Sequence, residues 1–276
     1  MVSLKDARYQ VLKNLFGPLV TDMLCPTEIV GESNIPSRGP ALLVANHRSV
    51  MDPYVMTART KRVVNWVMAP FVSSIPVFGW LAEQAGAISI IKGEEGKAEA
   101  LIDRMDAVLR QGRLVGIFPE GMDNFKRPVG PMTLSQFHGT FMRVVLRAAI
   151  PNLPVIPAAV FSKRDASLGE VKGSMMKLLD PSERAFALPD MKLVGYQEAL
   201  IVIGKPLRFD EYYDRYIHPT DRDGEDPAQQ ALVDQLTEQV RGSVANLLER
   251  AALLEAPTGG TLPGPVTLLP DHPVGT

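Results

Sequence analysis

Residues 41–52 read ALLVANHRSVMD, and this stretch decides the fold class. The short apolar run from Ala41 to Ala45 indicates a buried β-strand. A histidine and a carboxylate follow where the strand ends, and α/β folds place their chemistry at that edge of the sheet. The stretch therefore predicts an α/β protein with a site that contains His47 and Asp52.

His47 and Asp52 are close enough in sequence for a turn to fold the carboxylate back onto the ring. Ser49 is expected to be a helix N-cap, with Asp52 at the third helical position, because S-x-x-D is the spacing of a capping box. A histidine held by a carboxylate has a fixed tautomer and can act as a general base. The structural alternative makes Asp52 only a capping residue and His47 a satisfied polar residue at a strand end.

Three other segments end predicted strands with distinctive residues. Residues 116–121 read GIFPEG, residues 86–92 read GAISIIK, and residues 153–160 read LPVIPAAV. Taken singly, they indicate a turn with a solvated glutamate, a strand that ends at a solvated lysine, and a buried strand with prolines. Since the predicted strands alternate with predicted helices over 94–111, 134–149 and 228–254, an α/β architecture is favoured.

In this order the segments resemble the glycerolipid acyltransferases, the family that includes lysophosphatidic acid acyltransferase. That family has N-H-x-x-x-x-D, a glycine-led strand ending in a basic residue, F-P-E-G, and a proline-bearing strand. The match runs from about Ala41 to Val160, and residues 137–143 (FHGTFMR) are similar to the family's F-K-x-G segment. The resemblance implies a central mixed, largely parallel sheet flanked by helices, with the two main motifs meeting at one sheet edge.

The resemblance also implies roles in acyl transfer for phospholipid biosynthesis. His47 would remove a proton from an acceptor hydroxyl, and Asp52 would orient and stabilise His47. The donor would be acyl-CoA or an acyl carrier protein, used as a co-substrate, with no metal and no other cofactor. Acceptor binding is assigned to the residues at the remaining matching positions: Asn46, Lys92, Glu120 and Gly121.

Two departures from the family pattern concern the acceptor. The family continues F-P-E-G with threonine and arginine, whereas this chain has Met122 and Asp123, and the later family lysine is His138. A phosphate needs donors and positive charge, which Lys126 and Arg127 are expected to supply together with His138 and Lys92. The alternatives are a phosphate-free alcohol, an amine or another lysolipid as the acceptor, or a membrane-surface lipid-binding protein without turnover.

Composition excludes several other functions. The net charge of −2 argues against nucleic acid as a partner, and the single cysteine, Cys25, excludes an intramolecular disulfide. The four histidines are not at metal-ligand spacing. G-x-S-x-G, G-x-x-x-x-G-K-[ST] and G-x-G-x-x-G are missing from the sequence.

The chain is predicted to have three parts. Residues 1–28 form a helical segment that either lies on a membrane surface or packs on the core; residues 29–255 form the catalytic domain; residues 256–276, rich in Pro, Gly and Thr, form a flexible tail. Residues 63–82 carry no charge, but Pro70 and Pro76 argue against a spanning helix, so we expect a strand over Val63 to Met68, a loop, and a short apolar helix or turn near Phe71 to Ala82. Residues 163–190 are expected to be loop-like with at most one short helix, and the alternation over residues 192–203 predicts one or two strands. We expect peripheral or monotopic attachment at the cytoplasmic face of a membrane, where a lysolipid acceptor resides.

Overall fold

The computed structural model describes residues 11, 14, 17–69, 82, 86–90, 97–126, 129–172, 190–216, 226–256 and 264–269. Within these ranges seven strands form one sheet in the order β1-β8-β7-β2-β5-β3-β4. Their bounds are β1 (Thr27–Val30), β2 (Ala41–Ala45), β3 (Val64–Met68), β4 (Ile88–Ser89), β5 (Leu114–Ile117), β7 (Val155–Val171) and β8 (Met191–Ile203). Neighbouring strands are parallel except for β7 and β8, which are antiparallel. The predicted mixed, largely parallel sheet is confirmed.

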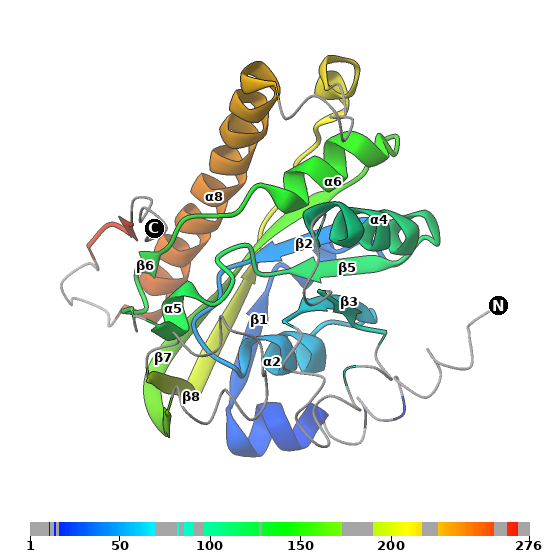
Figure 1. Ribbon diagram of the computed structural model, residues 1–276. Coiled ribbons are helices and arrows are strands. Elements are labelled where there is room, and N and C mark those ends of the chain that lie inside the picture. Colours follow the sequence, from blue (N-terminus) through cyan, green and yellow to red (C-terminus); the bar gives the residue numbers. More distant parts are fainter. Residues whose placement is uncertain are drawn as a thin grey trace.

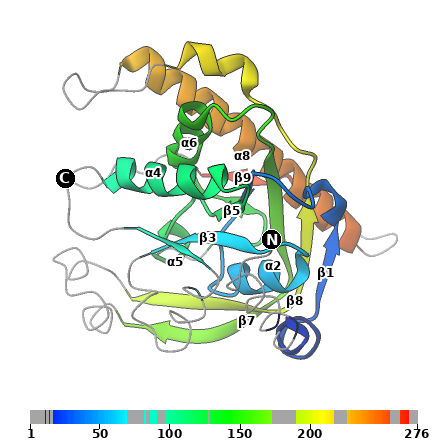
Figure 2. The same cartoon turned by 90° about the vertical axis from the view of Figure 1, so that its right-hand side faces the viewer.

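Helices cover both faces of this sheet (Figure 1). One face carries α4 (Lys97–Arg110), α6 (Thr140–Ala148) and α8 (Pro227–Glu255), and the other carries α2 (Asp52–Arg59) and the π-helix η1 (Leu19–Leu24). Figure 2 shows the two layers from the side, with α2 across the sheet from α4, α6 and α8. Short 3₁₀ helices are η2 (Glu32–Asn34) and η5 (Asp210–Arg215), and α5 (Asp123–Lys126) is one turn long.

The central strand β2 has a core on each side, because successive side chains of a strand point to opposite faces. Leu42 and Val44 pack in the cluster under α4, α6 and α8. Leu43 packs in the cluster under α2. All five residues of β2 are fully buried, which is why the strand reads as an unbroken apolar run.

Two of the three predicted helices agree closely with the structure. Helix α4 lies within the predicted 94–111, and α8 matches 228–254, where the Asp226 side chain caps its first turn by accepting from the N–H of Ala228. Helix α6 begins at Thr140 and not at residue 134. The reason is that Thr133 and Leu134 form β6, which pairs with β9 (Thr267–Leu268) in a small parallel sheet.

The expectation of a loop over residues 163–190 is wrong for its first part. Strand β7 continues to Val171 and pairs with β8 along most of its length. The charged residues that suggested a loop are on the exposed half of this hairpin, where Arg164 pairs with Glu198 across the strands. Residues 173–189 lie outside the described residues.

The C-terminal end of the chain differs in part from the expected flexible tail. Residues 264–269, from the tail predicted to be flexible, lie against the body of the molecule: β9 pairs with β6, and the carbonyl of Leu269 accepts a hydrogen bond from Arg241 of α8. Strand β3 forms where a strand was expected at the start of residues 63–82, and residues 70–81 lie outside the described ranges. In the part of the chain that the structure describes, no helix has the length and hydropathy to span a bilayer.

Candidate active site

The two main motifs meet at one edge of the sheet. Strands β2 and β5 are parallel neighbours, so the residues that follow them emerge side by side. The backbone N–H of His47 donates to Glu120 Oε1 at 2.6 Å, although the residues are 73 positions apart. The predicted convergence of the motifs is confirmed.

Asp52 holds the imidazole of His47 by a direct contact. His47 Nδ1 lies 2.8 Å from Asp52 Oδ2, and the same oxygen accepts from the backbone N–H groups of Arg48 and Ser49. The carboxylate is fully buried, whereas the His47 side chain keeps 15% of its surface exposed. The turn that was predicted to bring Asp52 onto the ring is therefore present, with the ring at the border between core and solvent.

The N-cap predicted at Ser49 is wrong. Helix α2 begins at Asp52, its N-cap residue is Met51, and no side chain caps it. The Ser49 hydroxyl instead donates to the carbonyl of Val194 on β8 at 2.7 Å and accepts from the N–H of Met51. Pro53, which is well suited to the first turn of a helix, moves the helix start to this point.

Glu120 is a buried clamp between two backbone segments. Its Oε1 binds the His47 N–H, and its Oε2 accepts from the N–H of Ser135 and the Nδ2 of Asn124, both at 2.7 Å. Asn124 also donates to the carbonyl of His47. Complete burial raises the pKa of Glu120 to about 7, although its N–H donors favour the carboxylate. Glu120 thus holds the motif loop through both oxygens, and contact with the acceptor stays a prediction.

Aromatic rings surround the imidazole. The ring of His47 stacks on Phe118 at a centroid distance of 4.3 Å, and Phe118 stacks on Trp66 of β3 at 4.6 Å. Phe125 of α5 meets His47 edge-on at 4.8 Å. Gly116 makes room for this stack, because a Cβ there would lie 2.5 Å from the Trp66 ring. The low-polarity walls strengthen the hydrogen bond to Asp52.

The other predicted binding residues fall into three groups. The side chain of Asn46 makes two hydrogen bonds with the backbone of Val160 on β7, so it fixes the end of β2. Gly121 has a φ of 60°, and its Cα faces the exposed His138 ring, since an added Cβ would lie 3.8 Å from that ring. Lys92, the side chain of Lys126, and Arg127 lie outside the described residues, so the predicted group of four cations remains untested.

Sequence reasoning missed two residues that fasten the motif loop. The guanidinium of Arg48 is 5% exposed and makes two hydrogen bonds to Asp165 of β7, at 2.6 and 3.0 Å. Tyr196 of β8 donates its hydroxyl to Asp52 Oδ1 at 2.6 Å. Both contacts join residues more than 110 positions apart, and no local pattern in the sequence marks them.

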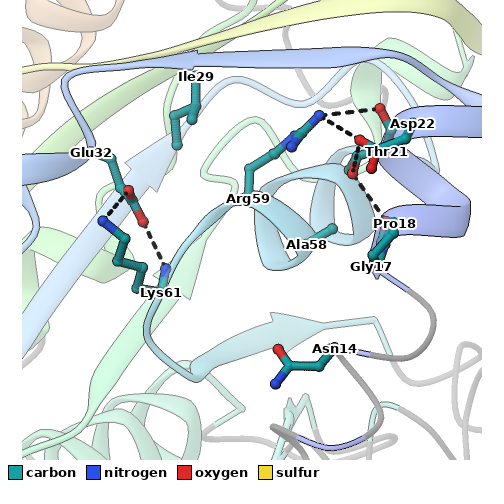
Figure 3. Close-up of a pocket in the computed structure, with 10 residues that line it drawn as sticks. All are labelled: Asn14, Gly17, Pro18, Thr21, Asp22, Ile29, Glu32, Ala58, Arg59 and Lys61. Carbon is teal, nitrogen blue, oxygen red and sulfur yellow. Dashed lines mark hydrogen bonds and ion pairs between the residues drawn. The ribbon is translucent and has the colours of Figure 1, made fainter.

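A pocket of about 500 Å³ lies at the other end of α2 (Figure 3). Its two cations are already paired: Arg59 binds Asp22, and Lys61 binds Glu32. None of the motif residues lines it. Because charge is balanced within the pocket, it does not have the excess positive charge of a phosphate site. Among the described residues, no group of three or more His, Cys, Asp or Glu side chains is arranged to hold a metal ion.

Comparison with known proteins agrees with this geometry. Residues 26–160 match the family model described as Acyltransferase. The chain is similar to the lyso-ornithine lipid O-acyltransferase of Pseudomonas aeruginosa, with 34% identity over 128 residues that cover 46% of this chain and 45% of that protein. It is also similar to the 1-acyl-sn-glycerol-3-phosphate acyltransferase of Borreliella burgdorferi, with 28% identity over 35% of this chain and 38% of that protein. The matched stretch thus spans less than half the length of either relative.

A solved structure shares the fold. The crystal structure of the 1-acyl-sn-glycerophosphate acyltransferase PlsC from Thermotoga maritima superposes with a TM-score of 0.50, covering 87% of this chain and 80% of that one at 15% identity. The family match over residues 26–160, the order of the motifs and the contact between His47 and Asp52 lead to one conclusion. Residues 26–160 of this chain form an acyltransferase domain that is similar to those of the glycerolipid acyltransferases.

Proposed function

We propose that this protein is an O-acyltransferase that moves a fatty acyl group from a thioester to a hydroxyl group of a lysolipid, with His47 as the general base. The observation that carries the proposal is the 2.8 Å contact between His47 Nδ1 and the buried Asp52 carboxylate. A ring nitrogen bound to a carboxylate is the one that carries the hydrogen. The other nitrogen, Nε2, is then the basic atom for the substrate.

The reaction follows from this tautomer. Nε2 takes the proton of the acceptor hydroxyl as its oxygen attacks the thioester carbonyl, and Asp52 stabilises the resulting imidazolium. The tetrahedral intermediate collapses with cleavage of the C–S bond. The thiolate leaves and recovers the proton from Nε2, which returns His47 to its neutral form. The products are an ester and a free thiol, and no covalent enzyme intermediate is needed.

The acceptor we favour is a lysolipid without a phosphate. Asp123 and Met122 stand where the family has arginine and threonine, so a negative charge replaces a phosphate-binding cation. The relative from P. aeruginosa is named for lyso-ornithine lipid. An ornithine headgroup carries an ammonium group, which suits an acidic residue. The donor is acyl-CoA or acyl carrier protein, and a bilayer surface supplies the acceptor.

Thiol release tests the proposal. The purified protein is given acyl-CoA or acyl carrier protein with either lyso-ornithine lipid or 1-acyl-sn-glycerol 3-phosphate, and the products are identified by mass spectrometry. His47→Ala should lower turnover by about 10³-fold, the usual contribution of general-base catalysis. His218→Ala is the matched control, since it makes the same change outside the motifs.

Each result decides a separate point. Equal turnover by His47→Ala and the parent protein would refute the base assignment. Lipid binding without thiol release from any acceptor would favour the lipid-binding alternative. A product formed on the amine and not on the hydroxyl would make the protein an N-acyltransferase.

A further inference from the structure

The second oxygen of Asp52 has a dedicated partner on β8. Tyr196 donates its hydroxyl to Asp52 Oδ1 at 2.6 Å, while His47 and two backbone N–H groups use Oδ2. Tyr196 is 2% exposed and Asp52 is fully buried, so water does not compete for this bond. Residue 196 lies beyond the stretch 26–160 that matches the family model, so the match does not assign this residue.

We propose that Tyr196 is a positioning residue that sets the strength of the general base through Asp52. This inference rests on the proposed function, because it assumes that His47 acts as the base. The chain His47–Asp52–Tyr196 links the ring to a hydroxyl that remains protonated. Burial, followed by the Asp52 charge, raises the pKa of Tyr196 well above its ordinary value, so the hydroxyl is a donor throughout the working pH range.

The direction of the effect follows from the charge on the carboxylate. A hydrogen bond to Oδ1 draws negative charge away from Oδ2 and weakens the hold of Asp52 on the His47 proton. Without this bond, Asp52 concentrates its charge on the imidazole, and the ring stays protonated up to a higher pH. Four other charged or titratable groups lie close to the hydrogen-bonded series His47–Asp52–Tyr196. They are Glu120 after β5, Arg48 in the motif loop, Asp165 on β7 and Cys25 before β1.

A purely structural role is the rival explanation, because β8 contacts the motif loop elsewhere too. The carbonyl of Val194 accepts from the Ser49 hydroxyl, and the N–H of Tyr196 approaches the sulfur of Met51 at 3.4 Å. These contacts fasten the loop whether or not the phenol is present. Loss of a mere fastening would lower stability and leave the titration of His47 where it was.

The test removes the hydroxyl with Tyr196→Phe. On the acid limb we expect kcat to fall about threefold with KM nearly unchanged, because a midpoint raised by about half a unit leaves about one third as much of the neutral His47 ring to act as the base. The acid limb of kcat/KM against pH should move up by about half a unit. NMR titration of the His47 ring in the substrate-free protein should show the same upward shift. With only four histidines in the chain, that signal can be assigned from the spectrum of His47→Ala.

Tyr213→Phe is the matched control. Its hydroxyl donates to the carbonyl of Ile150, a residue outside the motifs. The values of kcat and of the pH midpoint should therefore remain those of the parent protein. Should Tyr196→Phe fail to fold, 3-fluorotyrosine placed at position 196 keeps the shape. Its more acidic phenol is a stronger donor, so the midpoint should move down.

Opposite shifts with the two variants support the proposal, and an unchanged midpoint overturns it even if stability falls. Failure of the proposed function is a different result, because His47→Ala would then retain turnover. The NMR titration needs no turnover and still tests the link between Tyr196 and His47.

Discussion

The charge at position 123 is the sharpest difference between this chain and the family, because Asp123 stands where the family has arginine. The backbone of Asp123 begins α5 directly after Gly121 and Met122, close in sequence to the clamp residue Glu120. Asp123→Arg should raise the ratio of kcat/KM for 1-acyl-sn-glycerol 3-phosphate over that for lyso-ornithine lipid by about tenfold. The reason is that one charge-assisted hydrogen bond to phosphate is gained and a repulsive charge is lost. Competition assays with both acceptors measure this ratio. Asp123→Asn separates the effect of losing the aspartate charge from the effect of gaining the arginine.

Glu120 gives a prediction for stability against pH. Its folded pKa of about 7 lies above the ordinary value of 4.5, so the folded protein holds this proton up to a higher pH than the unfolded chain does. The stability contributed by the group is therefore fully present below pH 4.5 and is lost as pH rises to 7, by about 3 kcal/mol in total. Glu120→Gln cannot titrate. Chemical unfolding at several pH values should show the difference between parent and variant shrinking over this window, and a constant difference would contradict the assignment.

The same residue shows why the role of a motif residue is hard to infer from sequence alone. The F-P-E-G pattern indicated a polar residue at a sheet edge, and that location is confirmed. The pattern could not indicate that both oxygens of Glu120 would be used by backbone and amide donors, since Ser135 comes from a segment with no motif of its own. Position along a strand is local information, whereas the partners of a side chain depend on tertiary packing.

Among the helices and strands, hydrophobic periodicity predicted those elements whose side chains are buried in a regular pattern. The fully buried strand β2 and the long helix α8 were identified closely, since each has a continuous apolar pattern. In the hairpin β7–β8, the first part of β7 and the strand β8 were predicted, but the continuation of β7 to Val171 was not, because this outer half is solvated and its charged residues obscure the alternation. The contacts that complete the site come from this hairpin: Asp165 binds Arg48, and Tyr196 binds Asp52. The chemistry at the end of β2 was therefore predictable, and its support from β7 and β8 was not.

For the whole molecule, membrane attachment is the property that most needs a measurement. Met23 and Leu24 at the end of η1 are 75% and 64% exposed, and Val11 before them is 66% exposed. Exposed apolar side chains on a helix are the usual means of interfacial binding. The double variant Met23→Ser/Leu24→Ser should lower the constant for binding to liposomes, measured by co-sedimentation, by roughly a thousandfold, since about 2 kcal/mol of apolar burial is lost for each of the two side chains.

The control for that experiment changes exposed leucines elsewhere. Leu168 of β7 and Leu268 of β9 are 48% and 47% exposed, and Leu168→Ser/Leu268→Ser should bind liposomes as the parent does. Circular dichroism of each variant checks that the fold is kept. If all three proteins bind equally, η1 is not the attachment site.

The antiparallel hairpin β7–β8 also determines where the protein can be truncated. A recombinant fragment that stops at Val160 would retain the matched segment and every motif. It would lose Tyr196 and the Val194 carbonyl, which accepts the hydrogen bond of the Ser49 hydroxyl. Such a fragment would also leave β1 and the remaining part of β7 without their partner β8, and unpaired strand edges promote aggregation. The smallest catalytic unit worth expressing thus extends at least to Ile203, where β8 ends.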